Sequence, residues 1–134
     1  MYLLDTNIWL ERLLEQEHSD DVGSLLGQIS SDQLFITDFS FHSICLVLTR
    51  LKRPRSAIQF VNDLFLNGKV GLLTVPPNEI ESLLSAMEKF NLDFDDAYQY
   101  VVAERNDLTL VSLDNDFTRT SRGRKTPAEI LTQQ

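Results

Sequence analysis

Short apolar runs alternate with segments of helical periodicity along the whole chain, and this alternation constrains the fold more than any other feature of the sequence. The apolar runs at 2–4, 34–36, 70–75 and 108–113 are typical of buried strands, and the stretches between them repeat apolar residues every three or four positions. Strands separated by helices join a sheet in parallel. We therefore predict an α/β three-layer sandwich, with a mostly parallel central sheet of four to five strands flanked by helices.

The size and composition of the chain limit the alternatives. A chain of 134 residues that is 43% hydrophobic can bury one core and is too short for two ordinary domains, so we expect one domain over 1–134. No apolar stretch approaches the roughly 18 residues of a membrane span, and the N-terminal segment lacks the basic region of a secretory signal. With Cys45 as its only cysteine, the chain fits a reducing cytoplasm and no membrane.

Acidic residues stand where predicted strands end or a predicted helix begins. Asp5 follows the first apolar run, Asp114 and Asp116 follow the last, and Asp95 and Asp96 open a helix. Ligands bind beyond the carboxyl ends of parallel strands, and clustered carboxylates repel one another unless a divalent cation lies among them. Each acid also has a structural explanation, because aspartate is a preferred N-cap and turn residue. Their joint occurrence at one sheet edge favours metal-assisted phosphate chemistry.

Three segments carry a family resemblance: LLDTNIWL, LDFDDAYQYVVAERNDLTLVSLDNDF and TPAEIL. In order and spacing they resemble the PIN domain, and the length of the chain is similar to that of the VapC-type toxins of toxin-antitoxin pairs. The resemblance implies a PIN-like parallel sheet wrapped by helices. It also implies an endoribonuclease that depends on Mg²⁺ or Mn²⁺, forms a homodimer and is neutralised by a cognate antitoxin.

The acidic positions of the family can be carried over to this chain one by one. Its first acid falls on Asp5, the acid at the start of the late helix on Asp96, and the last on Asp114, which makes these three the expected catalytic metal ligands. Asp116 is expected as an auxiliary catalytic ligand or orienting group. The remaining auxiliary residues are Asn7, the polar residue of the first motif, and Asp95, which is expected to cap the late helix.

One acid that the resemblance implies is missing. The family usually has a glutamate about one turn into the helix after the second strand, and here Ser43 stands at that position, with Ser40 as the small hydroxyl residue three places earlier. Serine supplies no charge. Asp38 is a candidate substitute because it lies before the helix at the carboxyl edge of the sheet, whereas His42 points about 100° away from Ser43 if both are helical.

The charge distribution bears on whether the chain binds nucleic acid. A net charge of −8 opposes it, because phosphate backbones are held by lysine and arginine. Eight of the twelve basic residues nevertheless lie in two short segments, at 50–55 and 119–125. The first segment can be explained by its place at the end of a helix, where the helix dipole favours cations. The second follows the last acidic turn directly and is expected to hold RNA phosphates through four residues: Arg119, Arg122, Arg124 and Lys125.

Two functions of different classes fit these observations. The first is an RNA-cleaving nuclease that is the toxin of a toxin-antitoxin pair. The second is a PIN-like domain that has lost catalysis, with Ser43 as its signature, and that binds RNA or a protein partner. A phosphotransfer domain with Asp5 as acceptor is disfavoured because position 7 is asparagine rather than aspartate.

Overall fold

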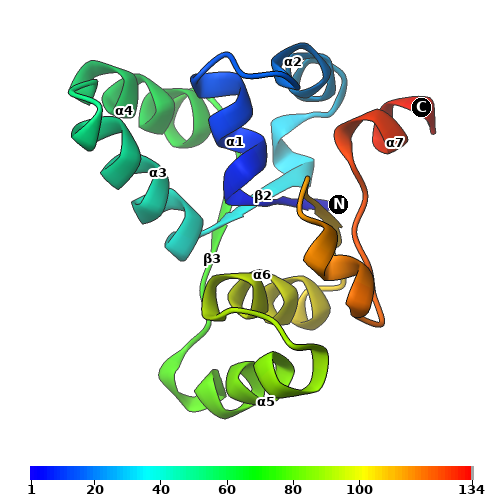
Figure 1. The fold of residues 1–134 in the computed structure, drawn as a ribbon. Coiled ribbons are helices and arrows are strands. Elements are labelled where there is room, and N and C mark those ends of the chain that lie inside the picture. Colours follow the sequence, from blue (N-terminus) through cyan, green and yellow to red (C-terminus); the bar gives the residue numbers. More distant parts are fainter. Residues whose placement is uncertain (134) are drawn as a thin grey trace.

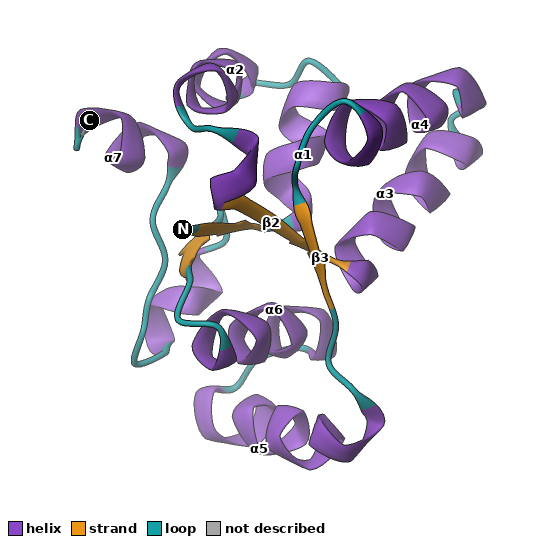
Figure 2. Ribbon diagram, turned by 180° about the vertical axis from the view of Figure 1, so that it is seen from behind, coloured by secondary structure: helices purple, strands orange, loops and turns teal. Residues whose placement is uncertain are grey.

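Four parallel strands form the central sheet of the computed structural model, which describes residues 1–133. Their order in the sheet is β3-β2-β1-β4, so that β1 and β2 are the inner strands and β1 has a neighbour on each side. Figure 2 shows the strands in orange between the helices, with β2 and β3 labelled. The strands are β1 (Tyr2–Leu4), β2 (Leu34–Thr37), β3 (Gly71–Leu73) and β4 (Thr109–Val111). Tyr2 pairs with Leu34 on one side and with Thr109 on the other. The predicted parallel α/β sheet is therefore confirmed.

Helices cover both faces of this sheet, as predicted for a three-layer sandwich. They are α1 (Thr6–Leu13), α2 (Ser19–Gln28), α3 (Asp38–Arg50), α4 (Pro54–Val61), α5 (Ile80–Phe90), α6 (Phe94–Arg105) and α7 (Pro127–Thr132). Helices α1 to α4 and α7 lie on one side, and α5 and α6 lie on the other (Figure 1). Within residues 1–133, no helix combines the length and the apolar character needed to cross a membrane.

The side chains of β1 pack into two separate hydrophobic clusters, one on each face of the sheet. Leu4 packs with the apolar side chains of α1 to α4, whereas Leu3 packs with those of α5 and α6. Both side chains are fully buried, because successive residues of a strand point to opposite faces and both faces are covered here. This explains why the first strand reads as an unbroken apolar run.

Helix α6 lies between the sheet and α5, and it is buried on almost every side. All eight residues from Asp96 to Ala103 are buried. The sequence of this helix contains one amide, Gln99, whose side chain is only 2% exposed. A polar side chain in such a position must find its partners inside the protein.

Several element boundaries differ from those predicted. The third and fourth strands are shorter than their apolar runs, because residues 70, 74, 75, 108, 112 and 113 lie outside the ladder pairs. Helix α4 begins at Pro54, where the missing N–H of proline costs nothing, and gives way to a π-helical turn at Asn62–Leu66. Three short 3-10 helices complete the chain at Ser31–Gln33, Pro77–Glu79 and Asn115–Arg119.

Candidate metal centre

Asp5 is held rigidly at the carboxyl end of the central strand. It is the N-cap of α1, where its Oδ1 accepts a hydrogen bond from the Thr6 N–H at 2.8 Å. Gln99 Nε2 donates to the same oxygen at 2.8 Å, and Ser112 Oγ donates to Oδ2 at 2.7 Å. Burial raises the pKa of Asp5, these three hydrogen bonds oppose the rise, and the negative charge of Asp114 adds to it.

A buried polar network extends from Asp5 across the sheet edge. The amide of Gln99 also donates to the hydroxyl of Ser40, which is fully buried on α3. That hydroxyl lies 2.7 Å from the Thr6 hydroxyl. The Gln99 Oε1 atom is buried and has no hydrogen-bond partner within the described chain. Three neutral donors thus meet at the Asp5 carboxylate, and Ser40 of α3 is linked to it through Gln99.

Three other carboxylates gather beside this network. One oxygen from each of Asp96, Asp114 and Asp116 lies within 4.8 Å of the others. Asp96 stands in the first turn of α6, and Asp114 caps the 3-10 helix after β4 by accepting the Asp116 N–H at 2.8 Å. Burial, followed by repulsion from Asp114, Asp5 and Asp95, raises the pKa of Asp96 to about 7.

Asp5, Asp96 and Asp114 open onto a common pocket of about 260 Å³, whereas Asp116 is not part of its lining. Its lining residues are Asp5, Thr6, Asn7, Leu10, Phe39, Ser43, Asp95, Asp96 and Asp114. Asn7 is fixed to the β4 end, because its Oδ1 accepts the Leu113 N–H at 3.3 Å and its Nδ2 donates to Ser112 Oγ at 3.4 Å. Ser43, which stands where the family resemblance implies a glutamate, contributes to the same wall.

Two residues behave differently from their sequence-based expectation. Asp95 does not cap α6: the helix begins at Phe94, and Asp93, with extended backbone angles, is its N-cap. The expected cap was therefore wrong by two residues, although the exposed Asp95 side chain lines the pocket. Asp38 lies outside the pocket lining, because its carboxylate accepts hydrogen bonds from the Tyr98 hydroxyl at 2.6 Å and from the Thr74 hydroxyl at 2.8 Å.

The basic loop after the acidic turn is largely engaged with the protein itself. Arg119 pairs with Asp116 at 2.6 Å, and Arg122 pairs with Asp107 at 3.0 Å. The backbone of Lys125 bonds to Leu110 and Ser112 beside β4.

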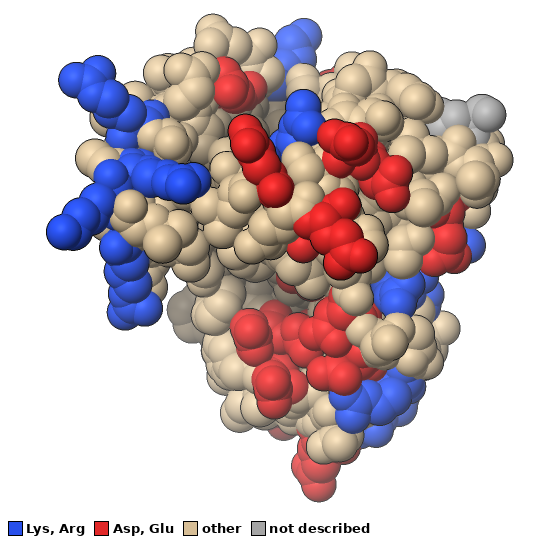
Figure 3. Space-filling model, turned by 45° about the horizontal axis from the view of Figure 1, so that its top comes forward, with Lys and Arg blue, Asp and Glu red and all other residues tan. Residues whose placement is uncertain are grey.

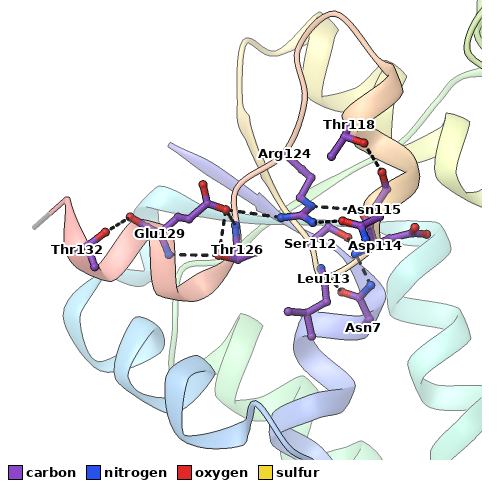
Figure 4. A network of polar contacts seen from close by, with 10 residues as sticks. All are labelled: Asn7, Ser112, Leu113, Asp114, Asn115, Thr118, Arg124, Thr126, Glu129 and Thr132. Atoms are coloured by element: carbon purple, nitrogen blue, oxygen red, sulfur yellow. Dashed lines mark hydrogen bonds and ion pairs between the residues drawn. The ribbon is translucent and has the colours of Figure 1, made fainter.

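Arg124 is the most deeply engaged residue of the loop, with a side chain that is 13% exposed. It donates to the Asp114 carbonyl and the Asn115 side chain, and it pairs with Glu129 of α7 (Figure 4). Glu129 in turn forms a capping box with Thr126 at the start of α7. Arg124 therefore ties the acidic turn to the last helix of the fold.

Sequence reasoning missed two residues that contact Asp5 directly. Gln99 is the lone amide in an otherwise apolar stretch of α6, three positions after Asp96, and this placement on the same helix face is a signal that could have revealed it. Ser112 follows the last strand immediately and donates to Asp5 from the neighbouring strand end. The position of Ser112 between the last strand and the acidic turn is the sequence feature that could have revealed this contact.

The donor set of the pocket fits a hard divalent cation. Mg²⁺ and Mn²⁺ prefer carboxylate oxygens, and three such oxygens converge here, of which the Asp116 carboxylate also pairs with Arg119 at 2.6 Å. The fold and the pocket together define an α/β protein with an acidic site at the carboxyl edge of a parallel sheet.

Comparison with known families identifies the chain more closely. The model of the PIN domain family matches residues 2–123, and the chain belongs to this family. No curated protein matches the sequence.

Several solved structures share the fold at low sequence identity. A toxin-antitoxin complex from Klebsiella pneumoniae matches with a TM-score of 0.76 and 17% identity, over 95% of this chain and 98% of that one. The FitAcB structure from Neisseria gonorrhoeae matches with a TM-score of 0.72 and 19% identity, over 96% and 99%. The Mycobacterium tuberculosis toxin VapC20, described as cleaving the sarcin-ricin loop, matches with a TM-score of 0.77 and 15% identity, over 91% and 96%.

Proposed function

We propose that this protein is a divalent-metal-dependent endoribonuclease and the toxin of a toxin-antitoxin pair. The observation that carries the proposal is the convergence of Asp96, Asp114 and Asp116 beside the fixed carboxylate of Asp5. Membership of the PIN family and the similarity to toxin structures support the same proposal, since VapC20 is described as a toxin that cleaves the sarcin-ricin loop.

The residues of the pocket have separable tasks in this proposal. Asp96, Asp114 and Asp116 would hold Mg²⁺ or Mn²⁺, and Asp5 would complete the acidic wall in a geometry set by Gln99 and Ser112. Bound there, the cation supplies Lewis-acid stabilisation for the hydrolysis of a phosphodiester. In that hydrolysis a water oxygen bonds to phosphorus while the bond from phosphorus to one ribose oxygen breaks.

Cleavage of a mixed pool of structured and single-stranded RNAs tests the nuclease. Wild-type protein should cut in Mg²⁺ or Mn²⁺ and not in EDTA. Loss of an outer-shell partner of a metal site costs about 10- to 100-fold, so Asp114→Asn should lower the rate by at least about 100-fold. Asp32→Asn, at an exposed position in the 3-10 helix Ser31–Gln33, is the matched control and should cut like wild type. Metal-independent cutting, or equal loss in both variants, would reject the proposal.

A second candidate function is a catalytically impaired domain that binds RNA or a protein partner. The observation that favours it is Ser43, which lines the pocket at the position where the family resemblance implies a glutamate. Calorimetric titration with Mn²⁺ separates the two candidates. Binding that is lost in Asp114→Asn supports the nuclease, whereas a folded protein that ignores Mn²⁺ and cuts no RNA supports the binding domain.

Partners follow from the same proposal. The similar structure from Klebsiella pneumoniae is described as a toxin-antitoxin complex, which supports a cognate antitoxin as partner. A homodimer is proposed as well, because Ile58 of α4 and Leu66 of the π-helical turn are 62% and 74% exposed. Sedimentation at micromolar concentration tests the dimer, and a purely monomeric species would contradict it.

A further inference from the structure

The turn between α3 and α4 carries four exposed basic residues, Arg50, Lys52, Arg53 and Arg55, which we call the basic corner. Within residues 1–133 none of the four forms an ion pair. Basic side chains gather at the upper left of Figure 3, the side on which Figure 1 has α3 and α4. The basic corner therefore leaves its positive charge available, unlike the Arg119–Lys125 loop.

Local structure does not account for these charges. Arg50 suits the last turn of α3, but Arg53 is the N-cap of α4 and Arg55 lies in its first turn, where the helix dipole disfavours cations. Lys52 has a φ of 59° because it directly follows the C-cap of α3, where the Arg53 N–H bonds to the Leu48 carbonyl at 2.8 Å in the left-handed turn that commonly ends a helix. The cations at the start of α4 therefore go against the helix dipole, and such departures from a local rule are expected at functional positions.

One face of α3 connects the basic corner to the acidic pocket. Phe39, Ser43, Leu46 and Arg50 follow one another at intervals of four, three and four residues, and so lie along one stripe of the helix. Phe39 and Ser43 line the pocket, and Leu46 is 49% exposed. Arg50 lies seven residues beyond Ser43, which is about 10 Å along the helix axis at ~1.5 Å per residue.

We propose that the basic corner binds the phosphate backbone of RNA, and that the exposed stripe of α3 leads the strand from this corner to the acidic pocket. The inference rests on the proposed nuclease function for the identity of its ligand. A span of about 10 Å corresponds to roughly three nucleotides at ~3.4 Å each. The corner thus holds phosphates a few nucleotides away from the bond that is cut, where repulsion from the carboxylates is weaker than in the pocket.

Fluorescence anisotropy with a labelled single-stranded RNA of mixed sequence, in EDTA and at low salt, tests the corner without cleavage. The double variant Lys52→Gln with Arg53→Gln should bind about tenfold more weakly at roughly 50 mM salt. Its slope of log affinity against log salt should be shallower by about 1.4, at ~0.7 per lost phosphate contact. The control pair, Lys69→Gln with Lys89→Gln, changes the net charge equally at exposed positions elsewhere and should bind like wild type.

A second variant separates binding from folding. Lys52→Gly removes the charge and relieves the left-handed backbone, so its thermal midpoint should equal or exceed that of wild type while RNA binding weakens. Undetectable binding by wild type, or equal weakening in the control pair, would overturn the inference. The cleavage assay reports on the nuclease separately: corner-dependent binding without metal-dependent cutting retains the corner and rejects the nuclease. Metal-dependent cutting by a protein whose RNA binding does not depend on the corner retains the nuclease and rejects the corner.

Discussion

Asp5 and Asp96 line the same pocket and are almost equally buried, at 6% and 8% exposed, but their neighbours differ in kind. The carboxylate of Asp5 accepts hydrogen bonds from three neutral donors on three elements. Asp96 faces Asp114 and Asp116, whose carboxylate oxygens lie within 4.8 Å. One half of the pocket is satisfied by the fold, and the other half concentrates negative charge.

This difference indicates that the fold fixes Asp5, whereas a bound cation would stabilise the carboxylates around Asp96. Asp5 has its geometry fixed before any cation arrives, because Gln99 and Ser112 already occupy both of its oxygens. The Asp96 half is electrostatically unfavourable on its own, as its raised pKa of about 7 indicates. A cation binding there would relieve repulsion rather than build new structure. Each half can be disturbed separately, and the expected effects differ in size and sign.

The largest effect is expected from Asp5→Ala. The substitution leaves the Thr6 N–H, the Gln99 amide and the Ser112 hydroxyl without their acceptor in the interior. At ~1–3 kcal/mol for each stranded buried donor, the free energy of unfolding should fall by about 3–5 kcal/mol in urea denaturation. Asp95→Ala, at the exposed rim of the same pocket, is the control and should change it by less than about 0.5 kcal/mol. Equal losses of unfolding free energy in the two variants would mean that the hydrogen-bonded Asp5 contributes no more to stability than the exposed Asp95.

The opposite sign is expected for Asp96→Asn in the absence of metal. The folded-state pKa of Asp96 is raised from 3.8 to about 7, so folding takes up a proton in that window and stability falls as pH rises from about 4 to about 7. Asn carries no charge, and each pKa unit is worth about 1.4 kcal/mol. The variant should therefore be more stable than wild type by about 2–4 kcal/mol at pH 8 in EDTA.

Measurement at two pH values sharpens this test. At pH 4 the wild-type carboxyl is already protonated in the folded protein, so the advantage of Asp96→Asn should largely disappear there. An advantage that is the same at pH 4 and pH 8 would mean that the substitution acts through packing and not through charge. Saturating Mn²⁺ should also reduce the advantage at pH 8, because only wild type keeps the full set of carboxylates.

The smallest effect is expected at Ser43, on the wall between the two halves. Ser43→Glu adds a carboxylate to the pocket and should strengthen Mg²⁺ binding by about 1 kcal/mol, or roughly fivefold in Kd. The rate of RNA cleavage should rise with it. Ser43→Gln has nearly the same size without the charge and is the control in calorimetric titration. If both variants bind Mg²⁺ equally, Ser43 lies out of reach of the ion.

The sequence was sufficient for the parallel sheet and for the meeting of acids from distant segments. Asp5 and Asp114 each directly follow a predicted apolar run, and parallel strands bring such positions to one edge of the sheet. Gln99 was missed because its role depends on α6 being covered on nearly every side, which periodicity alone does not reveal. Its position in an apolar stretch makes sense only once α5 is seen to close over the helix.

Side-chain partners explain the remaining differences. Asp38 stands at the right edge of the sheet, but it accepts a hydrogen bond from Tyr98, whose position beside α3 depends on how α6 packs. Arg119 pairs with Asp116 of the acidic turn, whereas Arg122 and Arg124 have partners outside the loop, in Asp107 after α6 and Glu129 of α7. Charge patterns give the number of cations in a segment, whereas their availability depends on tertiary neighbours. The role of this loop in RNA binding stays a prediction.

The central place of β1 in the sheet has a consequence for the timing of synthesis. Strand β1 is the first to leave the ribosome, and its neighbour β4 at residues 109–111 is among the last. At ~5–20 residues per second, translation of the intervening chain takes roughly 5–20 seconds, during which Asp5 has no Ser112 to bind and no Asp114 beside it. The acidic pocket therefore cannot exist on a nascent chain that has not yet supplied β4 and the acidic turn after it, and a ribosome that makes this protein meets no assembled site before that point.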